Sequence, residues 1–294
     1  MAKDTNIDFF GQFSKYARLA RLDKPVGFLL LLWPTLWGLW MAENGIPELG
    51  RLFIFVLGVF LMRSAGCIIN DIVDRDFDKN VQRTSNRELV KGTVSNTEAY
   101  IILVGLLSVA ASLLISLTNY AVNIAFIAAI TIVAYPFFKR FFPVPQAILG
   151  IAFGFGILMA FADTKESIEP IALTMFIANV FWAIGYDTAY AMVDKEDDLK
   201  LGLKSSAITF GNFDVYAVFV CQFAFLVLMI APISLMFFGF LYGFAWFIAA
   251  TYSFYLSRTL FLDTKESSFN FFQKSHRIGG ILFLGMFLDL SIQF

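Results

Sequence analysis

Long runs of apolar residues, separated by short polar segments, form the dominant pattern of this chain. A helix needs about 20 mostly apolar residues to cross the roughly 30 Å hydrocarbon core of a bilayer. Nine runs come close to that length, once two longer stretches are divided at turn-forming residues near Thr118 and Pro232. The pattern therefore predicts an all-α bundle of nine transmembrane helices, over residues 25–42, 52–69, 99–117, 120–138, 145–162, 170–186, 215–231, 239–256 and 278–294.

The distribution of Lys and Arg indicates which ends of these helices face the cytoplasm. If residues 1–24 are cytoplasmic, 20 of the 22 basic residues fall in cytoplasmic segments or at the helix ends beside them. Arg51 and Lys165 are then the two on the opposite face. Because an excess of Lys and Arg marks cytoplasmic loops, we expect a cytoplasmic N-terminal segment, residues 1–24, and a transmembrane domain, residues 25–294.

The composition supports a membrane protein and argues against some partners. Hydrophobic residues make up 59% of the 294 residues, whereas a soluble domain is about 45–50% apolar. The net charge of −1 gives no reason to expect a nucleic-acid partner, and no feature indicates an obligate protein partner. Cys67 and Cys221 lie within apolar runs, so we expect buried thiols rather than a disulfide or a zinc site.

An acidic motif continues directly from the cytoplasmic end of the second apolar run. Asn70, Asp74 and Asp78 stand four residues apart in it, and Asp71 lies beside them. If the helix continues through the motif, this spacing places the three oxygen-bearing side chains on one helical face.

A second acidic motif continues from the sixth run, four spans later. Asp187, Asp194 and Asp198 again fall on one helical stripe. Like charges on one helix face repel each other, so both motifs need a compensating cation. Oxygen ligands without His or Cys favour a hard cation, and Mg²⁺ typically binds one or two carboxylates together with water and phosphate oxygens. A single acidic run is usually a solvated loop, but the matching recurrence favours a Mg²⁺-pyrophosphate site.

Basic and aromatic residues near the motifs are candidates for binding an anion and a carbocation. Arg63 lies two helical turns before the first motif, within an apolar run where a charge is costly. It either binds pyrophosphate or a substrate carboxylate, or extends to the membrane surface. Other cations beside the motifs either neutralise phosphate oxygens or only set topology: Arg83, Arg87, Lys91, Lys139, Arg140, Lys200 and Lys204. Tyr186 and Tyr190 could line a prenyl pocket.

These motifs together resemble those of the UbiA superfamily of membrane prenyltransferases, over almost the whole chain. The segments that carry the resemblance are Leu22-Asp23-Lys24-Pro25-Val26-Gly27, Leu31-Leu32-Trp33-Pro34-Thr35-Leu36-Trp37, Met62-Arg63-Ser64-Ala65-Gly66-Cys67, the two acidic motifs, Tyr135-Pro136-Phe137-Phe138-Lys139-Arg140 and the stretch from Gly202 to Gly211. One departure is Asn86-Arg87-Glu88-Leu89, where the family commonly has Asn-Arg-Pro-Leu. The loss of proline leaves this loop less constrained.

The resemblance implies both a site and a reaction. It implies a central cavity with the two acidic motifs at its cytoplasmic end, and Mg²⁺ as cofactor. The implied metal ligands are Asn70, Asp74, Asp78, Asp194 and Asp198, and the implied catalytic residues are Asp71, Asp187 and Arg140. For substrate binding we expect Arg63, Lys139, Arg140, Tyr186, Tyr190 and Lys204.

The opening segment favours 4-hydroxybenzoate as acceptor and polyprenyl pyrophosphate as donor, an early step of ubiquinone biosynthesis. The prenyl tail would stay in membrane lipid, and the N-terminal segment lacks the Arg- and Ser-rich pattern of a transit peptide, which favours a bacterial inner membrane. The alternatives are another aromatic acceptor, an ion-coupled transporter and a membrane scaffold. A transporter's charges belong near the bilayer midplane, whereas these motifs lie at helix exits.

Overall fold

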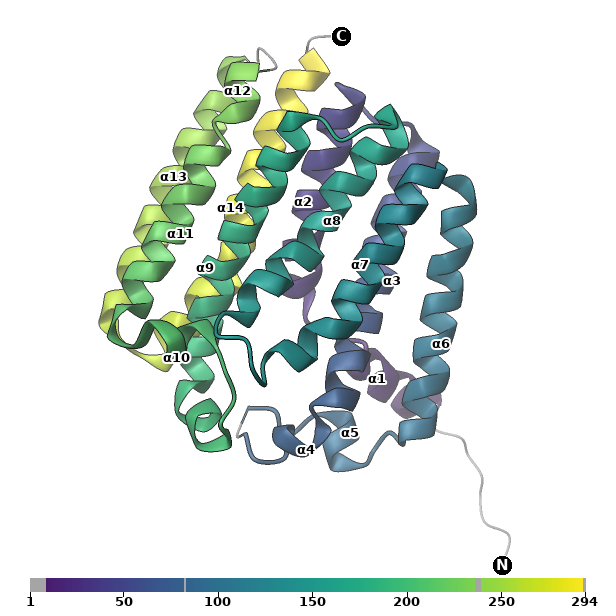
Figure 1. Cartoon of the computed structure of the whole chain (residues 1–294), viewed down its shortest axis with the longest axis vertical. Coiled ribbons are helices and arrows are strands. Elements are labelled where there is room, and N and C mark those ends of the chain that lie inside the picture. The colour runs from purple at the N-terminus through teal and green to yellow at the C-terminus, as the bar shows by residue number, and fades with distance from the viewer. Residues whose placement is uncertain (1–8, 82, 236–238, 293–294) are drawn as a thin grey trace, which may run out of the picture.

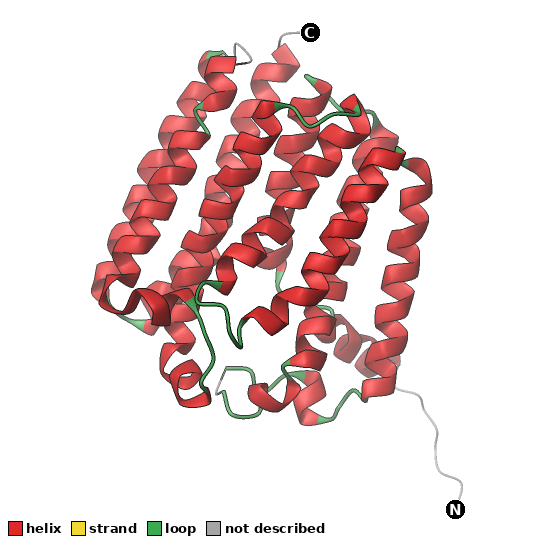
Figure 2. Cartoon of the chain, in the orientation of Figure 1, coloured by secondary structure: helices red, strands yellow, loops and turns green. Residues whose placement is uncertain are grey.

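The computed structural model describes residues 9–81, 83–235 and 239–292, and this part of the chain is helical without β-strands. Figure 1 shows long helices packed side by side, and Figure 2 shows short loops between them. The long helices are α2 (Pro25–Glu43), α3 (Leu49–Val73), α6 (Asn96–Leu113), α7 (Asn119–Phe138), α8 (Pro145–Lys165), α9 (Pro170–Leu201), α11 (Asp214–Leu228), α13 (Phe240–Thr259) and α14 (Lys265–Ile292). The short elements are α1 (Phe9–Leu19), α4 (Arg75–Asp78), α5 (Glu88–Lys91), α10 (Ser206–Phe210), α12 (Ala231–Leu235) and the 3₁₀ turns η1 (Leu114–Ser116), η2 (Gly211–Phe213) and η3 (Leu260–Leu262).

Eight helical stretches of the described residues are long and apolar enough to cross a membrane. They match eight of the predicted spans, and the all-helical membrane bundle is therefore confirmed. The remaining predicted span, residues 239–256, corresponds to α13, which has 20 residues but carries several Tyr, Ser and Thr side chains. The count of nine and the orientation stay predictions, although α1 lies at one end of the bundle and α14 ends at the other (Figure 1).

Local sequence signals explain where several helices begin and end. Pro25, Pro145 and Pro170 occupy the first turns of α2, α8 and α9, where a missing backbone N–H costs nothing. A capping box built on Ser95 starts α6. Gly202, with φ of 69°, ends α9 in the left-handed conformation that favours glycine.

Both acidic motifs lie at the end of the bundle where α1, α4, α5 and α10 gather (Figure 1). The second motif is entirely helical because α9 continues to Leu201, well past the predicted end of the span at residue 186. The first motif is not one continuous helix, because α3 ends at Val73 and Asp74 separates it from α4. Backbone bonds from Asp74 to Asn70 and from Asp78 to Asp74, both 2.9 Å, preserve the four-residue spacing across this break.

Aromatic side chains fill the centre of the bundle. The Trp182 ring lies 5.4 Å from the rings of both Trp37 and Phe225, and all three side chains are fully buried. The Trp37 indole N–H donates to the carbonyl oxygen of Gly279 at 3.1 Å, joining α2 to α14. A Cβ at Gly279 would lie 2.6 Å from Trp182, so only glycine permits this approach. The predicted buried thiols are confirmed, since Cys67 and Cys221 are free and buried.

Candidate active site

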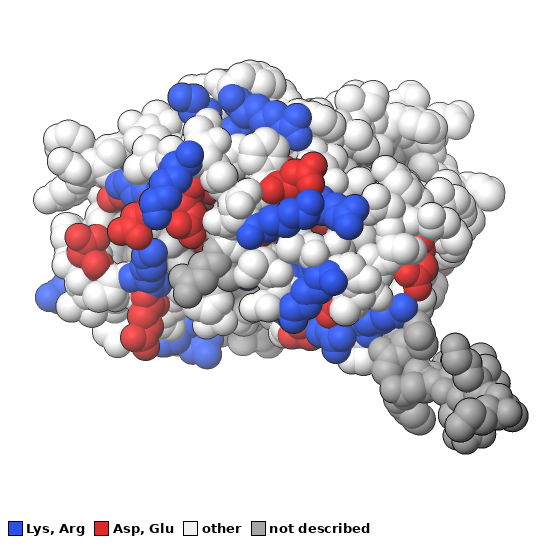
Figure 3. Space-filling model, turned by 90° about the horizontal axis from the view of Figure 1, so that it is seen from below, with Lys and Arg blue, Asp and Glu red and all other residues white. Residues whose placement is uncertain are grey.

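The two acidic motifs meet through an arginine of the loop that follows α4. The Arg83 Nε atom lies 3.0 Å from both carboxylate oxygens of Asp194 on α9, and its Nη2 lies 2.5 Å from one of them. The same guanidinium lies over the Tyr190 ring, 4.5 Å from its centroid, and donates to the Tyr190 hydroxyl. Desolvation lowers the pKa of Arg83, but Tyr190, Asp194 and Asp78 outweigh that effect and raise it, so this residue stays a cation between the two motifs. Figure 3, a view of this end of the molecule, shows basic and acidic side chains interspersed.

Lys139, just past the end of α7, contacts the first motif. Its Nζ lies 3.2 Å from the Asn70 side-chain oxygen and 3.0 Å from an Asp74 carboxylate oxygen. Burial lowers the pKa of Lys139, but Tyr135 and Asp74 outweigh that effect and raise it, so the ammonium group is retained. Asn70 and Asp74 thus present their oxygens to one cation, as expected of side chains four residues apart.

Asp71 faces the other side of the first motif and lies in a closed ion-pair network. Its side chain is 1% exposed and pairs with Arg21 at 2.7 Å and with Arg87 at 3.0 Å. Arg87 also pairs with Asp78. Burial raises the pKa of Asp78, and Arg87 acts against that shift. Arg21, at the corner between α1 and α2, was missed by the sequence argument, because nothing local distinguishes it from the other basic residues of that segment.

The second motif keeps two carboxylates without an ion pair. Asp187 and Asp198 have no cation within 4 Å among the described residues, although Lys139 and Arg83 lie close enough to act on both electrostatically. Asp187 is also near Arg63. These two acids therefore remain available for a ligand, whereas the other acids of the site are already paired.

The predicted aromatic residues line the α9 side of the site. Tyr186 is buried and packs edge-on against Trp182, and its hydroxyl has no hydrogen-bond partner among the described residues. The Tyr190 ring stacks on Phe272 of α14 with centroids 4.3 Å apart. The Tyr190 ring thus contacts both Phe272 and the Arg83 guanidinium, and the Tyr186 ring is buried against Trp182.

Arg63 lies half-buried between the acidic site and the apolar interior. Its guanidinium packs where a Cβ at Gly27 would lie, 5.9 Å from the Phe153 ring centroid. With Arg21, Ser64 and Phe28 it lines a cavity of about 160 Å³. Two guanidinium groups and a hydroxyl around an aromatic-walled cavity suit a small aromatic acid.

Arg140 and Lys204 lie farther from the acidic side chains. The exposed Arg140 guanidinium covers the rings of Phe137 and Phe77, at 5.2 and 5.5 Å from their centroids. The exposed Lys204 contributes its backbone N–H, which donates to the Lys139 carbonyl at 2.7 Å. The structure therefore brings Lys139 to the oxygens of Asn70 and Asp74, whereas Arg140 contacts the first motif through the Phe77 ring. The roles of Arg140 and Lys204 stay predictions.

The departure at Glu88 has a structural substitute for the missing proline. Glu88 is the first residue of α5, a position where proline is favoured. Its carboxylate accepts from Arg18 of α1 at 2.5 Å and from the Thr93 hydroxyl. Although burial acts in the opposite direction, these bonds lower the pKa of Glu88. The loop is therefore held by side-chain contacts instead of a fixed backbone angle.

The oxygen donors of the site suit Mg²⁺ only together with a further ligand. The described residues contain no closed cluster of three or more His, Cys, Asp or Glu side chains. They offer one or two oxygens at each place instead, from Asn70 with Asp74 and from Asp194 with Asp198. Mg²⁺ usually binds one or two carboxylates and completes its shell with water and phosphate oxygens. The residues therefore fit Mg²⁺ that is held jointly by the protein and a pyrophosphate.

Known proteins are similar to this chain over most of its length. Residues 31–284 match the UbiA prenyltransferase family. The chain is 48% identical over 290 residues to the 4-hydroxybenzoate octaprenyltransferase of Polynucleobacter asymbioticus, covering 96% of this chain and 98% of that protein. It is 57% identical over 218 residues to the protein of the same name from Cupriavidus necator, covering 74% and 76% of the two chains.

Solved structures share the fold. The apo structure of a UbiA homolog from Aeropyrum pernix K1 superposes with a TM-score of 0.79 at 24% identity, covering 89% of this chain and 97% of that one. A UbiA homolog from Archaeoglobus fulgidus bound to GPP and Mg²⁺ gives a TM-score of 0.70 at 19% identity, covering 94% and 99%. With the match over residues 31–284, this chain belongs to the UbiA prenyltransferase family.

Proposed function

We propose that this protein transfers a polyprenyl chain from polyprenyl pyrophosphate to 4-hydroxybenzoate, at the ring carbon ortho to the hydroxyl. The observation that carries the proposal is the 48% identity, over nearly the whole of both chains, to a protein named for that reaction. The two acidic motifs, joined by Arg83, and the basic cavity beside them support it. The reaction is an early step of ubiquinone biosynthesis, and the site faces the cytoplasm from a bacterial inner membrane.

The pyrophosphate would bind between the two motifs. Asn70, Asp74, Asp78, Asp194 and Asp198 would hold Mg²⁺, and the bound metal would supply positive charge opposite the leaving group. Lys139 and Arg83 would exchange part of their contacts with the motifs for phosphate oxygens, as charge-assisted hydrogen bonds. The site thus has a cation on each side of the leaving group.

The allylic C–O bond breaks with its electron pair leaving on pyrophosphate, and Tyr190, Tyr186 and Phe272 shield the carbocation from water. Arg63 holds the acceptor carboxylate in the 160 Å³ cavity. The π electrons of the ring form the new C–C bond at the ortho carbon. Asp187 then takes the ring proton, because it has no ion pair and lies near Arg63. Asp71 is instead bound by Arg21 and Arg87, and it holds the first motif in place.

Purified protein in lipid nanodiscs tests the reaction directly. We would supply 4-hydroxybenzoate and octaprenyl pyrophosphate, with Mg²⁺ or with EDTA, and detect the prenylated acid by mass spectrometry. The expected result is a Mg²⁺-dependent product that Asp74→Ala and Asp194→Ala each reduce at least 100-fold. Turnover of another aromatic acid, but not of 4-hydroxybenzoate, would overturn the acceptor. Folded protein that turns over no acceptor would favour the transporter alternative.

A further inference from the structure

Arg21 occupies a backbone position that usually belongs to glycine. It follows α1 with a φ of 57°, in the left-handed region. Its N–H donates to the Arg18 carbonyl at 3.1 Å, and the Leu22 N–H donates to the Ala17 carbonyl at 2.9 Å, which is the bond pattern of a Schellman helix end. Because a side chain in this conformation costs free energy that glycine avoids, the strain points to a role of the Arg21 side chain beyond the turn itself.

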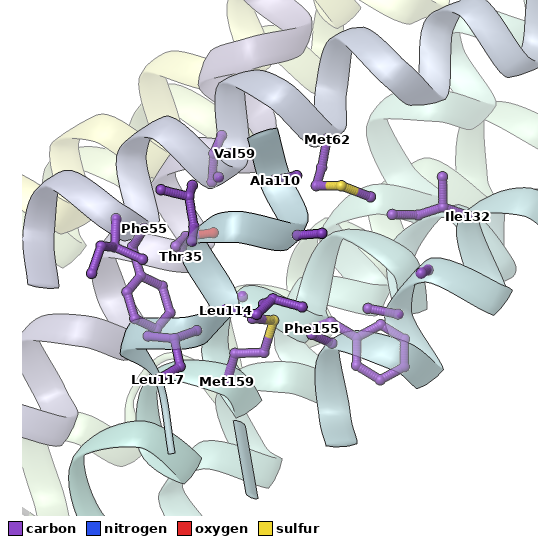
Figure 4. Close-up of a pocket in the computed structure, with 18 of the residues that line it drawn as sticks. Thr35, Phe55, Val59, Met62, Ala110, Leu114, Leu117, Ile132, Phe155 and Met159 are labelled. Atoms are coloured by element: carbon purple, nitrogen blue, oxygen red, sulfur yellow. The ribbon is translucent and has the colours of Figure 1, made fainter. Parts of the chain in front are cut away.

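The Arg21 side chain lines a cavity that suits an anion. Arg63 and Ser64 also line this cavity of about 160 Å³, and no carboxylate of the described residues lies within 4 Å of the Arg63 guanidinium. The larger, apolar cavity of about 250 Å³ drawn in Figure 4 has Thr35 as the one polar side chain of its lining. Of these two cavities, the smaller is therefore the one that suits a carboxylate, between two guanidinium groups.

The same guanidinium binds the first acidic motif. Its Nη2 donates to both carboxylate oxygens of Asp71, at 2.8 and 2.7 Å, and its Nη1 donates to the Arg18 carbonyl at 3.0 Å. Its Nε–H has no acceptor among the residues that the structure describes. A guanidinium carries five N–H donors, so Arg21 has a donor left for a second carboxylate while it contacts the first. One side chain thus reaches from the cavity to the motif.

Asp71 connects Arg21 to Asp78, one of the proposed metal ligands. The Arg87 Nη1 atom lies 3.0 Å from an Asp71 oxygen and also pairs with Asp78. The side chains of Asp71 and Asp78 are 1% and 9% exposed, and those of Arg21 and Arg87 are 15% and 17% exposed. Two arginines and two carboxylates therefore form a largely buried set whose charges balance.

Either ligand alone would disturb this balance, whereas both together would keep it. A carboxylate in the cavity attracts Arg21, so Asp71 depends more on Arg87, and Asp78 loses part of its pairing. If Asp78 instead binds Mg²⁺, Arg87 can turn fully to Asp71, and Arg21 is left with spare donors. With both ligands present, Arg21 holds the acceptor carboxylate, Arg87 holds Asp71, and Asp78 binds the metal. Each buried charge then has a partner, as a charge removed from water requires.

We propose that Arg21 is a positioning residue that links the acceptor cavity to the first acidic motif, so that an acceptor carboxylate and Mg²⁺-pyrophosphate each strengthen the binding of the other. The inference rests on the proposed function and deepens it, because it makes the carboxylate of the acceptor, and not its ring alone, the group that completes the metal site. Such coupling is reciprocal, and it is typically about 5- to 150-fold. A neutral phenol does not attract Arg21, so it binds without this coupling.

Binding measurements without a prenyl chain test the coupling, because no turnover occurs. The protein in lipid nanodiscs is titrated with 4-hydroxybenzoate by isothermal titration calorimetry, alone and with saturating Mg²⁺ and inorganic pyrophosphate. We expect the Kd for 4-hydroxybenzoate to fall at least fivefold when Mg²⁺ and pyrophosphate are present. The Kd for pyrophosphate with Mg²⁺ should fall by the same factor when 4-hydroxybenzoate is saturating. The neutral analogue 4-hydroxybenzamide should show less than a twofold change, and equal factors for acid and amide would overturn the role of the carboxylate.

Two substitutions at Arg21 test the residue itself. Arg21→Gln should reduce the coupling factor below twofold. Arg21→Lys keeps a cation beside Asp71, and hence the fold, but lacks the planar fork that holds two carboxylates, so it should also reduce the factor below twofold. Arg75→Gln is the matched control, because Arg75 of α4 donates to the Leu89 carbonyl and the Asn96 side chain rather than to a carboxylate, and it should keep the wild-type factor.

Thermal unfolding of each variant shows that the protein measured is folded. A wild-type factor near one, or a wild-type factor retained in folded Arg21→Gln or Arg21→Lys, would overturn the inference while 4-hydroxybenzoate still binds. Wild-type protein that binds no 4-hydroxybenzoate under any of these conditions would overturn the proposed acceptor itself.

Discussion

The ion-pair network around Asp71 gives the sharpest prediction, because it separates a catalytic role for this residue from a structural one. Arg21 binds both carboxylate oxygens, at 2.8 and 2.7 Å, and Arg87 lies 3.0 Å from one of them. Removing one member of a buried ion-pair network costs about 3–5 kcal/mol, because the partners stay buried without a counter-charge. Arg21 and Arg87 are 15% and 17% exposed, and Arg87 keeps Asp78. We therefore expect the lower end, about 3 kcal/mol, for Asp71→Ala.

The assay is thermal unfolding in a fixed detergent, followed by intrinsic tryptophan fluorescence. A loss of about 3 kcal/mol corresponds to a fall in Tm of roughly 6–12 °C for a chain of this size. Asp76→Ala is the control, because Asp76 is in the same segment but is 88% exposed and pairs only with Lys79. An exposed pair contributes at most about 1 kcal/mol.

A double-mutant cycle with Arg21→Gln identifies the source of the loss. If the network acts as a unit, Asp71→Ala costs much less when Arg21 is already replaced. An unchanged Tm in Asp71→Ala, combined with a large fall in kcat, would refute the structural assignment and return Asp71 to the catalytic group. Equal effects of Asp71→Ala in both backgrounds would show that Arg21 is not its energetic partner.

Three further predictions concern the cytoplasmic end of the bundle. Lys139→Ala should reduce kcat/KM for the prenyl donor at least tenfold, whereas Arg140→Ala, measured in parallel, should change it less than threefold. A larger loss of kcat/KM in Arg140→Ala than in Lys139→Ala would contradict the placement of Lys139. Arg83→Gln should speed proteinase K cleavage within residues 79–87, seen by mass spectrometry, and an unchanged rate would mean that Arg83 does not secure this loop. Glu88→Gln should lower Tm at pH 7 by a few degrees. Folding lowers the pKa of Glu88, so its carboxylate stabilises the protein fully above the unfolded pKa of 4.5. This stabilisation is lost as the pH falls through the folded pKa, so the Tm values of the variant and the wild type should converge in acid. A Tm difference that stays constant with pH would refute this reasoning.

The membrane bundle was predictable from sequence because its signal is strong and local. Runs of apolar residues of the right length have few alternatives to a spanning helix, and eight of them reappear as such helices. The break at Asp74 was harder to predict, because the i to i+4 backbone bonds continue on both sides of it and the sequence there contains neither Gly nor Pro.

The acidic residues of the candidate site were also predictable, because the spacing within each motif places their side chains on one helical face. Their ion-pair partners were not predictable, because these lie far away in the sequence. Arg21 and Asp71 are 50 positions apart, and Arg83 and Asp194 are 111 positions apart. One sequence can pair its cations with its carboxylates in many ways, and only the packing of α1, α3 and α9 selects among them. Asp163 of α8 was not predicted for the same reason, since its partners Arg51 and Thr118 lie on α3 and in the turn before α7.

The paired state of the site also bears on how substrate binds. Burying separate charges is expensive, and the protein offsets that cost here by placing Lys139 and Arg83 against Asp74 and Asp194. Under the proposed function, a pyrophosphate that enters with Mg²⁺ would bring both signs of charge and could satisfy these cations and carboxylates together. The exchange would replace one set of ion pairs with another. Pyrophosphate alone or Mg²⁺ alone would leave one set unmatched, and each should therefore bind much more weakly than the two together.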